Sequence, residues 1–255
     1  MGTHGILCFF YVPMISGVSD NCNMDKRFLN TADDLFSAID AEGFLPLFGN
    51  AVTGFSVEDR TPFGGWWTGL EEIDPWEWRI IAARSGRVAY SKFFDGRAGF
   101  ISLDWFPVFA NWKRDGYDFD ALYDDGKATL RQKKIMDVFM NGEEHFSFEA
   151  KRLAGFGKDG EKNFEGIVTG LEKATYLVIK DFRRRINKKG GEYGWHIAVL
   201  SSPEGIWGYD AVTSSYAEDP ELSYQKIMDH LALLYPGTSP EEIMDVLGGS
   251  AVLKG

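Results

Sequence analysis

Cysteine is almost absent from the 255 residues, and histidine is scarce. The two cysteines, Cys8 and Cys22, both precede residue 23, so the rest of the chain has neither a disulfide framework nor a cysteine zinc site. This usage favours a reducing cytoplasm. The four histidines are scattered without metal-ligand spacing, and no Walker A, GxSxG or HExxH signature occurs. We therefore expect no resident metal and no cofactor.

Long apolar runs are also lacking. The segment from Ile6 to Val18 is too short to span a bilayer, and it lacks the preceding Lys or Arg of a signal peptide. We therefore expect no membrane association. Residues 1–23 are predicted to be a disordered extension, and Met24 is an alternative start of translation.

Positive charge is in deficit, with a net charge of −11. The charge is uneven: residues 31–79 hold ten acidic residues against two basic ones, whereas residues 180–189 hold six basic residues against one acidic. A protein whose whole surface attracts DNA is excluded. Any contact with nucleic acid is confined to a local cationic segment.

That segment belongs to a stretch that reads as helix, turn, helix and hairpin. Ser147 is predicted to cap a short helix that Gly155 ends. Apolar residues recur at helical spacing from Phe164 to Leu171, and two strands then flank a basic turn at 187–191. With a helix predicted around 128–140 in front of it, this order is typical of a winged helix, a nucleic-acid-binding fold.

An earlier stretch has a similar plan. Thr31 is predicted to cap a helix, Asp74-Pro75 with Glu77 is a strong helix start, and Asp95-Gly96 is a two-residue hairpin turn. We predict an α+β fold with tandem winged-helix units and a short helical C-terminus. After the extension, the predicted parts are a tryptophan-rich winged-helix-like unit (24–112), a winged-helix domain with a basic wing (113–210) and C-terminal helices (211–255).

The predicted hairpin and the helix before it carry the candidate nucleic-acid contacts, because cations on a wing and on one helix stripe can reach phosphates. These residues are Lys162, Thr169, Lys173, Arg183, Arg184, Arg185, Lys188 and Lys189. The alternative is a solvated basic hairpin without a ligand. Winged helices also serve in protein interactions.

Two further groups could carry chemistry. Thirteen aromatic residues lie between Phe63 and Trp112, and Trp66, Trp67 and Trp105 are candidates for a pocket that stacks on a base. Adjacent Trp66 and Trp67 cannot both face one core easily, so we expect one to be exposed. Asp118 and Asp120, in the acidic segment 115–125, are candidates for acid/base hydrolysis of a glycosidic bond. Core packing and a solvated turn are the respective alternatives.

The segments DPWEWR, VAYSKFFDGRAGFISLDWFP, RDGYDFDALYDDG and KRLAGFGKDGEKNFEGIVTGLEKATYLVI together resemble AlkZ-related proteins. These are distant relatives of the AlkZ (YcaQ-type) winged-helix DNA glycosylases. The resemblance covers roughly residues 30–247. It implies tandem winged helices and a role in DNA binding or repair. It also implies, for the glycosylases themselves, excision of alkylated or cross-linked bases without a metal by a Gln-x-Asp or Gln-x-Gln motif.

Neither catalytic motif is present in this chain. Its two glutamines, Gln132 and Gln225, are followed two residues later by Lys134 and Ile227, and the place where the motif is expected reads FLPLF. No catalytic residue carries over. The sequence leaves open a DNA-binding protein without the family's chemistry, a hydrolase that uses the 115–125 carboxylates, and a protein-interaction scaffold.

Overall fold

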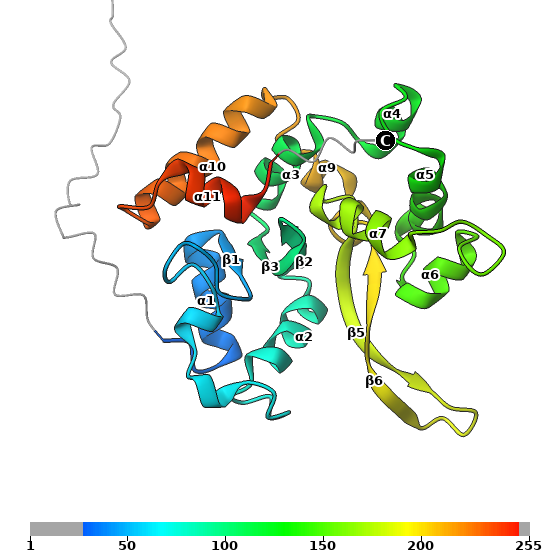
Figure 1. Cartoon of the computed structure of the whole chain (residues 1–255), viewed down its shortest axis with the longest axis horizontal. Helices are drawn as coiled ribbons and strands as arrows, with labels where there is room; N and C mark the ends of the chain where they lie inside the picture. The colour runs from blue at the N-terminus through cyan, green and yellow to red at the C-terminus, as the bar shows by residue number, and fades with distance from the viewer. Residues whose placement is uncertain (1–27, 250–255) are drawn as a thin grey trace, which may run out of the picture.

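The computed structural model describes residues 28–249 (Figure 1). The predictions for residues 1–23 lie outside the described residues. The first part of the chain contains α1 (Ala32–Glu42), β1 (Phe44–Pro46), the 3-10 turns η1 (Glu58–Arg60) and η2 (Phe63–Gly65), α2 (Pro75–Ser85), β2 (Val88–Phe94), β3 (Arg97–Ser102) and α3 (Phe106–Arg114). Helices and small antiparallel sheets make up the fold, which confirms the predicted α+β class.

The second part contains α4 (Phe119–Asp124), α5 (Leu130–Met136), η3 (Asp137–Gly142), β4 (His145–Phe146), α6 (Ser147–Leu153), α7 (Phe164–Lys173), β5 (Val178–Ile186) and β6 (Glu192–Ser201). The C-terminal part contains α8 (Pro203–Trp207), α9 (Tyr209–Val212), α10 (Pro220–Leu234) and α11 (Pro240–Leu247). The helices α10 and α11 confirm the predicted helical C-terminus.

The two sheets have the same strand order, β1-β3-β2 and β4-β6-β5. In each sheet a short first strand pairs antiparallel with the last strand, which also pairs with the middle one. The predicted turn between β2 and β3 is confirmed. Both Asp95 and Gly96 have positive φ, +48° and +83°, as a two-residue hairpin turn requires.

One of two predicted helix starts needs correction, and the other is confirmed. Ser147 is the first residue of α6 and the cap position falls on Phe146, because Phe146 is held in β4 opposite Val199. Asp74 caps α2 as predicted, accepting a hydrogen bond from the backbone N–H of Trp76 at 2.8 Å. The other Asp74 oxygen accepts from the glycine-rich loop, at the N–H of Gly69.

The cores of the predicted units are shared. One cluster joins α1, α2 and the first sheet to α5, α7 and the second sheet, through Leu35, Ile39, Trp78, Phe100, Ile135, Phe139, Val168, Leu171 and Leu200. A second cluster covers the first sheet with α3 and the C-terminal helices, through Phe44, Phe93, Ile101, Phe109, Ile227, Leu231, Ile243 and Leu247. Burial of these two apolar clusters holds the parts of the chain together.

Candidate nucleic-acid interface and acidic pocket

The β5–β6 hairpin projects from the body, and its far end points away from the helices (Figure 1). Asn187 organises the turn: its side-chain oxygen accepts from the backbone N–H groups of Lys189 and Gly191, at 2.8 and 3.1 Å. The strands on either side run beyond the body. The side chains of Arg184, Arg185, Lys188 and Lys189 are exposed there, which gives the acidic protein a concentrated cationic end.

Arg183 has a different role at the base of the hairpin. It donates to Asp181 and to Glu144, both at 2.7 Å. Asp181 is 6% exposed and also accepts from Arg84 of α2 at 3.0 Å. Burial alone would raise the pKa of Asp181, but the hydrogen bonds from Arg183, from the Phe182 N–H and from Arg84 lower it. This network fixes the hairpin to the body.

Helix α7, which precedes the hairpin, is mostly covered. Lys173 donates to Asp95 at 2.6 Å, and the Thr169 hydroxyl accepts from Lys92 at 3.2 Å. Lys162, just before the helix, donates to the carbonyls of Gly157 and Lys158. These three predicted DNA contacts therefore already have partners within the protein.

The loop to which Lys162 donates has glycines at 155, 157 and 160, in the pattern G-x-G-x-x-G. In a dinucleotide site such a loop follows a strand and cradles a pyrophosphate. Here it follows helix α6, and a Cβ on Gly160 would lie 2.2 Å from the Gly155 carbonyl oxygen. The glycines thus serve close packing of the loop on itself.

The hairpin also carries an exposed apolar surface that the sequence analysis did not identify. Trp195 is 91% exposed, and Ile186 and Tyr193 of the same hairpin are exposed as well. Tyr193 lies opposite Arg185 in the strand register. The alternation of apolar residues along this strand was recognised in the sequence. That these side chains pack against no core is known only from the structure, in which the hairpin extends beyond the body.

The three tryptophans predicted to form a pocket do not all come together: the rings of Trp66 and Trp67 are in contact, with centroids 5.6 Å apart, whereas Trp105 stacks on another residue. Trp66 is buried and donates its indole N–H to the Thr61 hydroxyl at 2.9 Å. Trp67 is 65% exposed, which confirms that one of the adjacent pair faces solvent. Trp105 stacks on His230 of α10 with ring centroids 4.3 Å apart. The contacts of Trp105 thus lie in the C-terminal core rather than beside Trp66.

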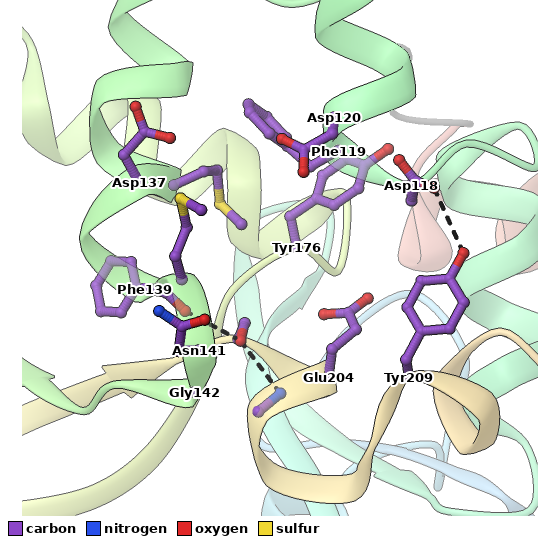
Figure 2. Close-up of a pocket in the computed structure, with 14 residues that line it drawn as sticks. Asp118, Phe119, Asp120, Asp137, Phe139, Asn141, Gly142, Tyr176, Glu204 and Tyr209 are labelled. Atoms are coloured by element: carbon purple, nitrogen blue, oxygen red, sulfur yellow. Dashed lines mark hydrogen bonds between the residues drawn. The ribbon is translucent and has the colours of Figure 1, made fainter.

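Asp118 and Asp120 line a cavity of about 550 Å³ (Figure 2). Asp118 caps α4, accepting from the Ala121 N–H at 2.8 Å, and its second oxygen accepts from the Tyr209 hydroxyl at 3.4 Å. The walls are aromatic and thioether side chains together with two further carboxylates: Phe119, Met136, Phe139, Met140, Tyr176, Tyr209, Asp137 and Glu204. The two predicted acids therefore do share an aromatic-lined cavity.

Glu204, Asp137 and Asp120 of this acidic pocket have cationic partners, whereas Asp118 has none among the described residues. Glu204 pairs at 2.5 Å with Arg114, whose side chain is fully buried. Lys133 forms an ion pair with Asp137 and lies 3.8 Å from Asp120. Burial, with the nearby Asp118 carboxylate, raises the pKa of the Tyr209 hydroxyl. The pocket is thus acidic and aromatic, a combination suited to a cationic ligand.

The acidic pocket and the cationic end of the hairpin face different regions. The pocket is built by α4, α5, η3, α8 and α9, whereas the hairpin end lies on the opposite side of the molecule from α4 (Figure 1). Glu204, Tyr176 and Tyr209 were missed by the sequence analysis because each lies more than 50 residues from Asp118. No periodicity or motif joins positions that only tertiary packing brings together.

Within residues 28–249, no three His, Cys, Asp or Glu side chains are grouped so as to hold a metal ion. None of the helices in that span is both long enough and apolar enough to cross a membrane.

The model of the family described as AlkZ related matches residues 29–248. It spans both sheets, the hairpin and the acidic pocket, and it confirms the resemblance predicted over residues 30–247. No curated protein and no solved structure matches the chain.

Proposed function

The chain belongs to the AlkZ-related family, and from this premise we propose that it is a cytoplasmic winged-helix protein that binds nucleic acid, DNA in the first place. The proposal does not include the base excision of the AlkZ glycosylases, because neither the Gln-x-Asp nor the Gln-x-Gln motif occurs in the sequence. It requires no metal and no cofactor.

The topology supports the winged-helix interpretation. In a winged helix a short strand after the first helix pairs with the last strand of the wing. The second unit has this order, with α5, β4, α6, α7 and the β5–β6 hairpin in sequence and β4 beside β6. The first unit repeats the strand order, with two 3-10 turns in place of the middle helix. This likeness supports a tandem arrangement.

One observation carries the proposal. The end of the hairpin has four exposed cations, Arg184, Arg185, Lys188 and Lys189, on a protein of net charge −11. These four positive charges lie close together on the projecting hairpin, and their mutual repulsion lowers the stability of the protein. A bound polyanion offsets that repulsion. We assign the phosphate contacts primarily to these four residues. Arg183, Lys162, Thr169 and Lys173 contribute less, since each already has protein partners.

The test is DNA binding measured by fluorescence anisotropy across salt. Reversing Arg184, Arg185 and Lys188 to Glu is expected to abolish binding to duplex, nicked and single-stranded DNA. The wild-type affinity should fall roughly 10-fold or more between about 50 and 200 mM salt, because each phosphate contact adds about 0.9 to the log–log slope.

A matched control reverses three cations that lie away from the end of the hairpin. Lys127, Arg131 and Lys226 belong to the α4–α5 loop, to α5 and to α10. Changing them to Glu alters the net charge equally and should leave most of the affinity intact. Undetectable or salt-independent binding by the wild type would refute the proposal.

A second function is favoured by the acidic pocket. Asp118 and Asp120 line an aromatic cavity, as a glycosidic hydrolase requires of its carboxylate pair. This alternative predicts alkali-sensitive sites in alkylated DNA, lost in Asp118→Asn and in Asp120→Asn. The distance of the pocket from the hairpin end speaks against it, and so does the solvent exposure of Asp120. A protein-interaction scaffold has less support, because residues 184–195 of the hairpin are exposed, although Arg185 lies over the ring of Phe148 in the body.

A further inference from the structure

A second cavity, of about 600 Å³, lies between the two predicted units and shares no lining residue with the acidic pocket. Its walls come from both sheets, α2, α6 and α7. Most of the lining is apolar or aromatic: Leu47, Phe48, Trp76, Tyr90, Phe148, Phe164, Val168, Ile179, Phe182 and Leu200. Cavities of this size and character are typical of small-molecule sites.

Arg79 is the exceptional member of the lining. The residue is 5% exposed, and its guanidinium carbon lies 3.7 Å from the ring centroid of Trp76 and 4.2 Å from that of Phe182. Among the described residues no hydrogen bond or ion pair reaches the guanidinium, and its Nη1 atom is fully buried without an acceptor. The two rings cover its faces, and its N–H groups have no acceptor among the described residues, so the hydrogen bonds an arginine makes to an anion are unused here.

The other Lys and Glu side chains that line this cavity form ion pairs. Glu172 pairs with Lys92 at 3.1 Å and accepts from the Ser91 hydroxyl at 2.9 Å. Lys151 pairs with Glu165 at 2.8 Å. The cation without a partner is therefore Arg79, and a buried cation is costly unless an anion accompanies it. The ligand that fits carries a negative group on a flat, apolar body.

The position of the cavity narrows the range of possible ligands further. Phe182, His196 and Ala198 of the lining belong to β5 and β6, the strands that carry the cationic hairpin end. A nucleic-acid strand bound along the hairpin therefore reaches the cavity at the end of the hairpin that joins the body. Every nucleotide joins an anionic phosphate to a planar base that stacks on aromatic side chains.

We propose that this cavity binds a single nucleotide, with its phosphate on Arg79 and its base against Phe48, Phe148 and the neighbouring rings. The choice of a nucleotide over other flat anions rests on the proposed function. The nucleotide can be free in solution or be the 5′-phosphorylated end of a strand, and in both cases the phosphate monoester is the group recognised.

The experiment compares phosphorylated with unphosphorylated probes on the full chain by calorimetry. One arm uses deoxyadenosine 5′-monophosphate against deoxyadenosine. The other uses a short single strand with a 5′-phosphate against the same strand with a 5′-hydroxyl. A charged hydrogen bond of this kind corresponds to a roughly 10- to 100-fold preference for the phosphorylated probe.

Arg79→Gln should remove that preference and leave the affinity for the hydroxyl strand unchanged. Arg79→Lys, which retains the positive charge, should keep part of the preference for the phosphorylated probe. Phe148, on the partly exposed side of the cavity, provides a second variant that does not endanger folding: Phe148→Ala should weaken both phosphorylated probes several-fold. Unfolding curves confirm that each variant is folded.

A preference in the strand arm alone assigns the cavity to strand ends, and a preference in the mononucleotide arm assigns it to free nucleotides. Equal affinity for phosphorylated and unphosphorylated probes in both arms overturns the proposal. If the hairpin does not bind DNA, the comparison of the mononucleotide with the nucleoside still tests whether the cavity binds a nucleotide. If the strand binds through the hairpin but shows no phosphate preference, the proposed function stands and this inference fails.

Discussion

Lys173 Nζ lies 2.6 Å from Asp95 Oδ1, so the last turn of α7 is tied to the turn between β2 and β3. The methyl group of Thr169, one helical turn earlier, would lie 3.6 Å from a Cβ on Gly96 in the same turn. In a winged helix that reads DNA, the corresponding helix enters the major groove. Here its outer face joins the two predicted units, which leaves the hairpin as the accessible cationic element.

Lys173 is therefore predicted to contribute little to DNA binding. Lys173→Gln should leave the salt dependence of affinity unchanged, because the lysine already neutralises Asp95, whereas Arg184→Gln should reduce the log–log slope by about 0.9. The free energy of unfolding should fall by less than about 1 kcal/mol, since the pair is partly exposed. Anisotropy titrations and urea denaturation measure the two effects. A slope equally reduced by Lys173→Gln would show that the helix contacts phosphates.

Trp195 is predicted to stack on unpaired bases. Its side chain is 91% exposed on the hairpin, so Trp195→Ala should change the stability by no more than about 0.5 kcal/mol. Affinity for single-stranded DNA should fall by roughly 5-fold or more, because base–aromatic stacking contributes about 1–3 kcal/mol. Trp67→Ala is the matched control, an exposed tryptophan away from the hairpin. Equal effects of the two substitutions would contradict a stacking role.

Local structure was predictable from the sequence where short-range chemistry decides it. Thr31 caps α1 and forms a capping box with Asp34, and the turn at Asn187 closes the second hairpin as expected. Such signals involve residues within four positions of each other. Even these depend on context: Phe146 displaces Ser147 from the cap of α6 because pairing with β6 fixes its backbone.

The sites were less predictable, because they depend on long-range packing. Asp118 and Asp120 could be predicted as a pair, but not the cavity around them, which Glu204 of α8 and Tyr209 of α9 complete. Arg79 stands in an ordinary helical pattern, and nothing in that pattern indicates that Phe182, 103 residues later, covers its guanidinium. The fold class followed from local patterns, while the cavities are properties of the assembled core.

Asp181 is predicted to make stability depend on pH in acid. Its folded pKa is below the ordinary value of 3.8 because hydrogen bonds from Arg183, Phe182 N–H and Arg84 outweigh its burial. The stabilisation is complete above the unfolded pKa and is lost as pH falls through the lower folded pKa. Asp181→Asn should thus destabilise the protein by about 2 kcal/mol at neutral pH. The difference from wild type should narrow below about pH 4.

Urea denaturation at stepped pH measures this difference. Glu144→Gln is the control, because Glu144 binds the same Arg183 from a more exposed position and should cost less than about 1 kcal/mol. A difference between wild type and Asp181→Asn that stays constant down to the lowest pH would show that the carboxylate charge is not the cause.

Two buried arginines are predicted to respond in opposite ways to the same substitution. Arg114 donates to Glu204, to the Tyr216 hydroxyl and to both oxygens of Thr175, at 2.5–2.9 Å. Arg114→Met leaves these acceptors without their donor and should lower the free energy of unfolding by about 3 kcal/mol or more. Arg79→Met removes a buried cation that has no hydrogen-bonding partner among the described residues, while the thioether keeps the packing on Trp76. It should leave the stability unchanged or raise it by about 1 kcal/mol or more. Urea denaturation measures the free energy of unfolding of the two variants side by side and tests this difference. If Arg79→Met destabilises the protein as much as Arg114→Met, the guanidinium of Arg79 serves folding and has no need of a ligand.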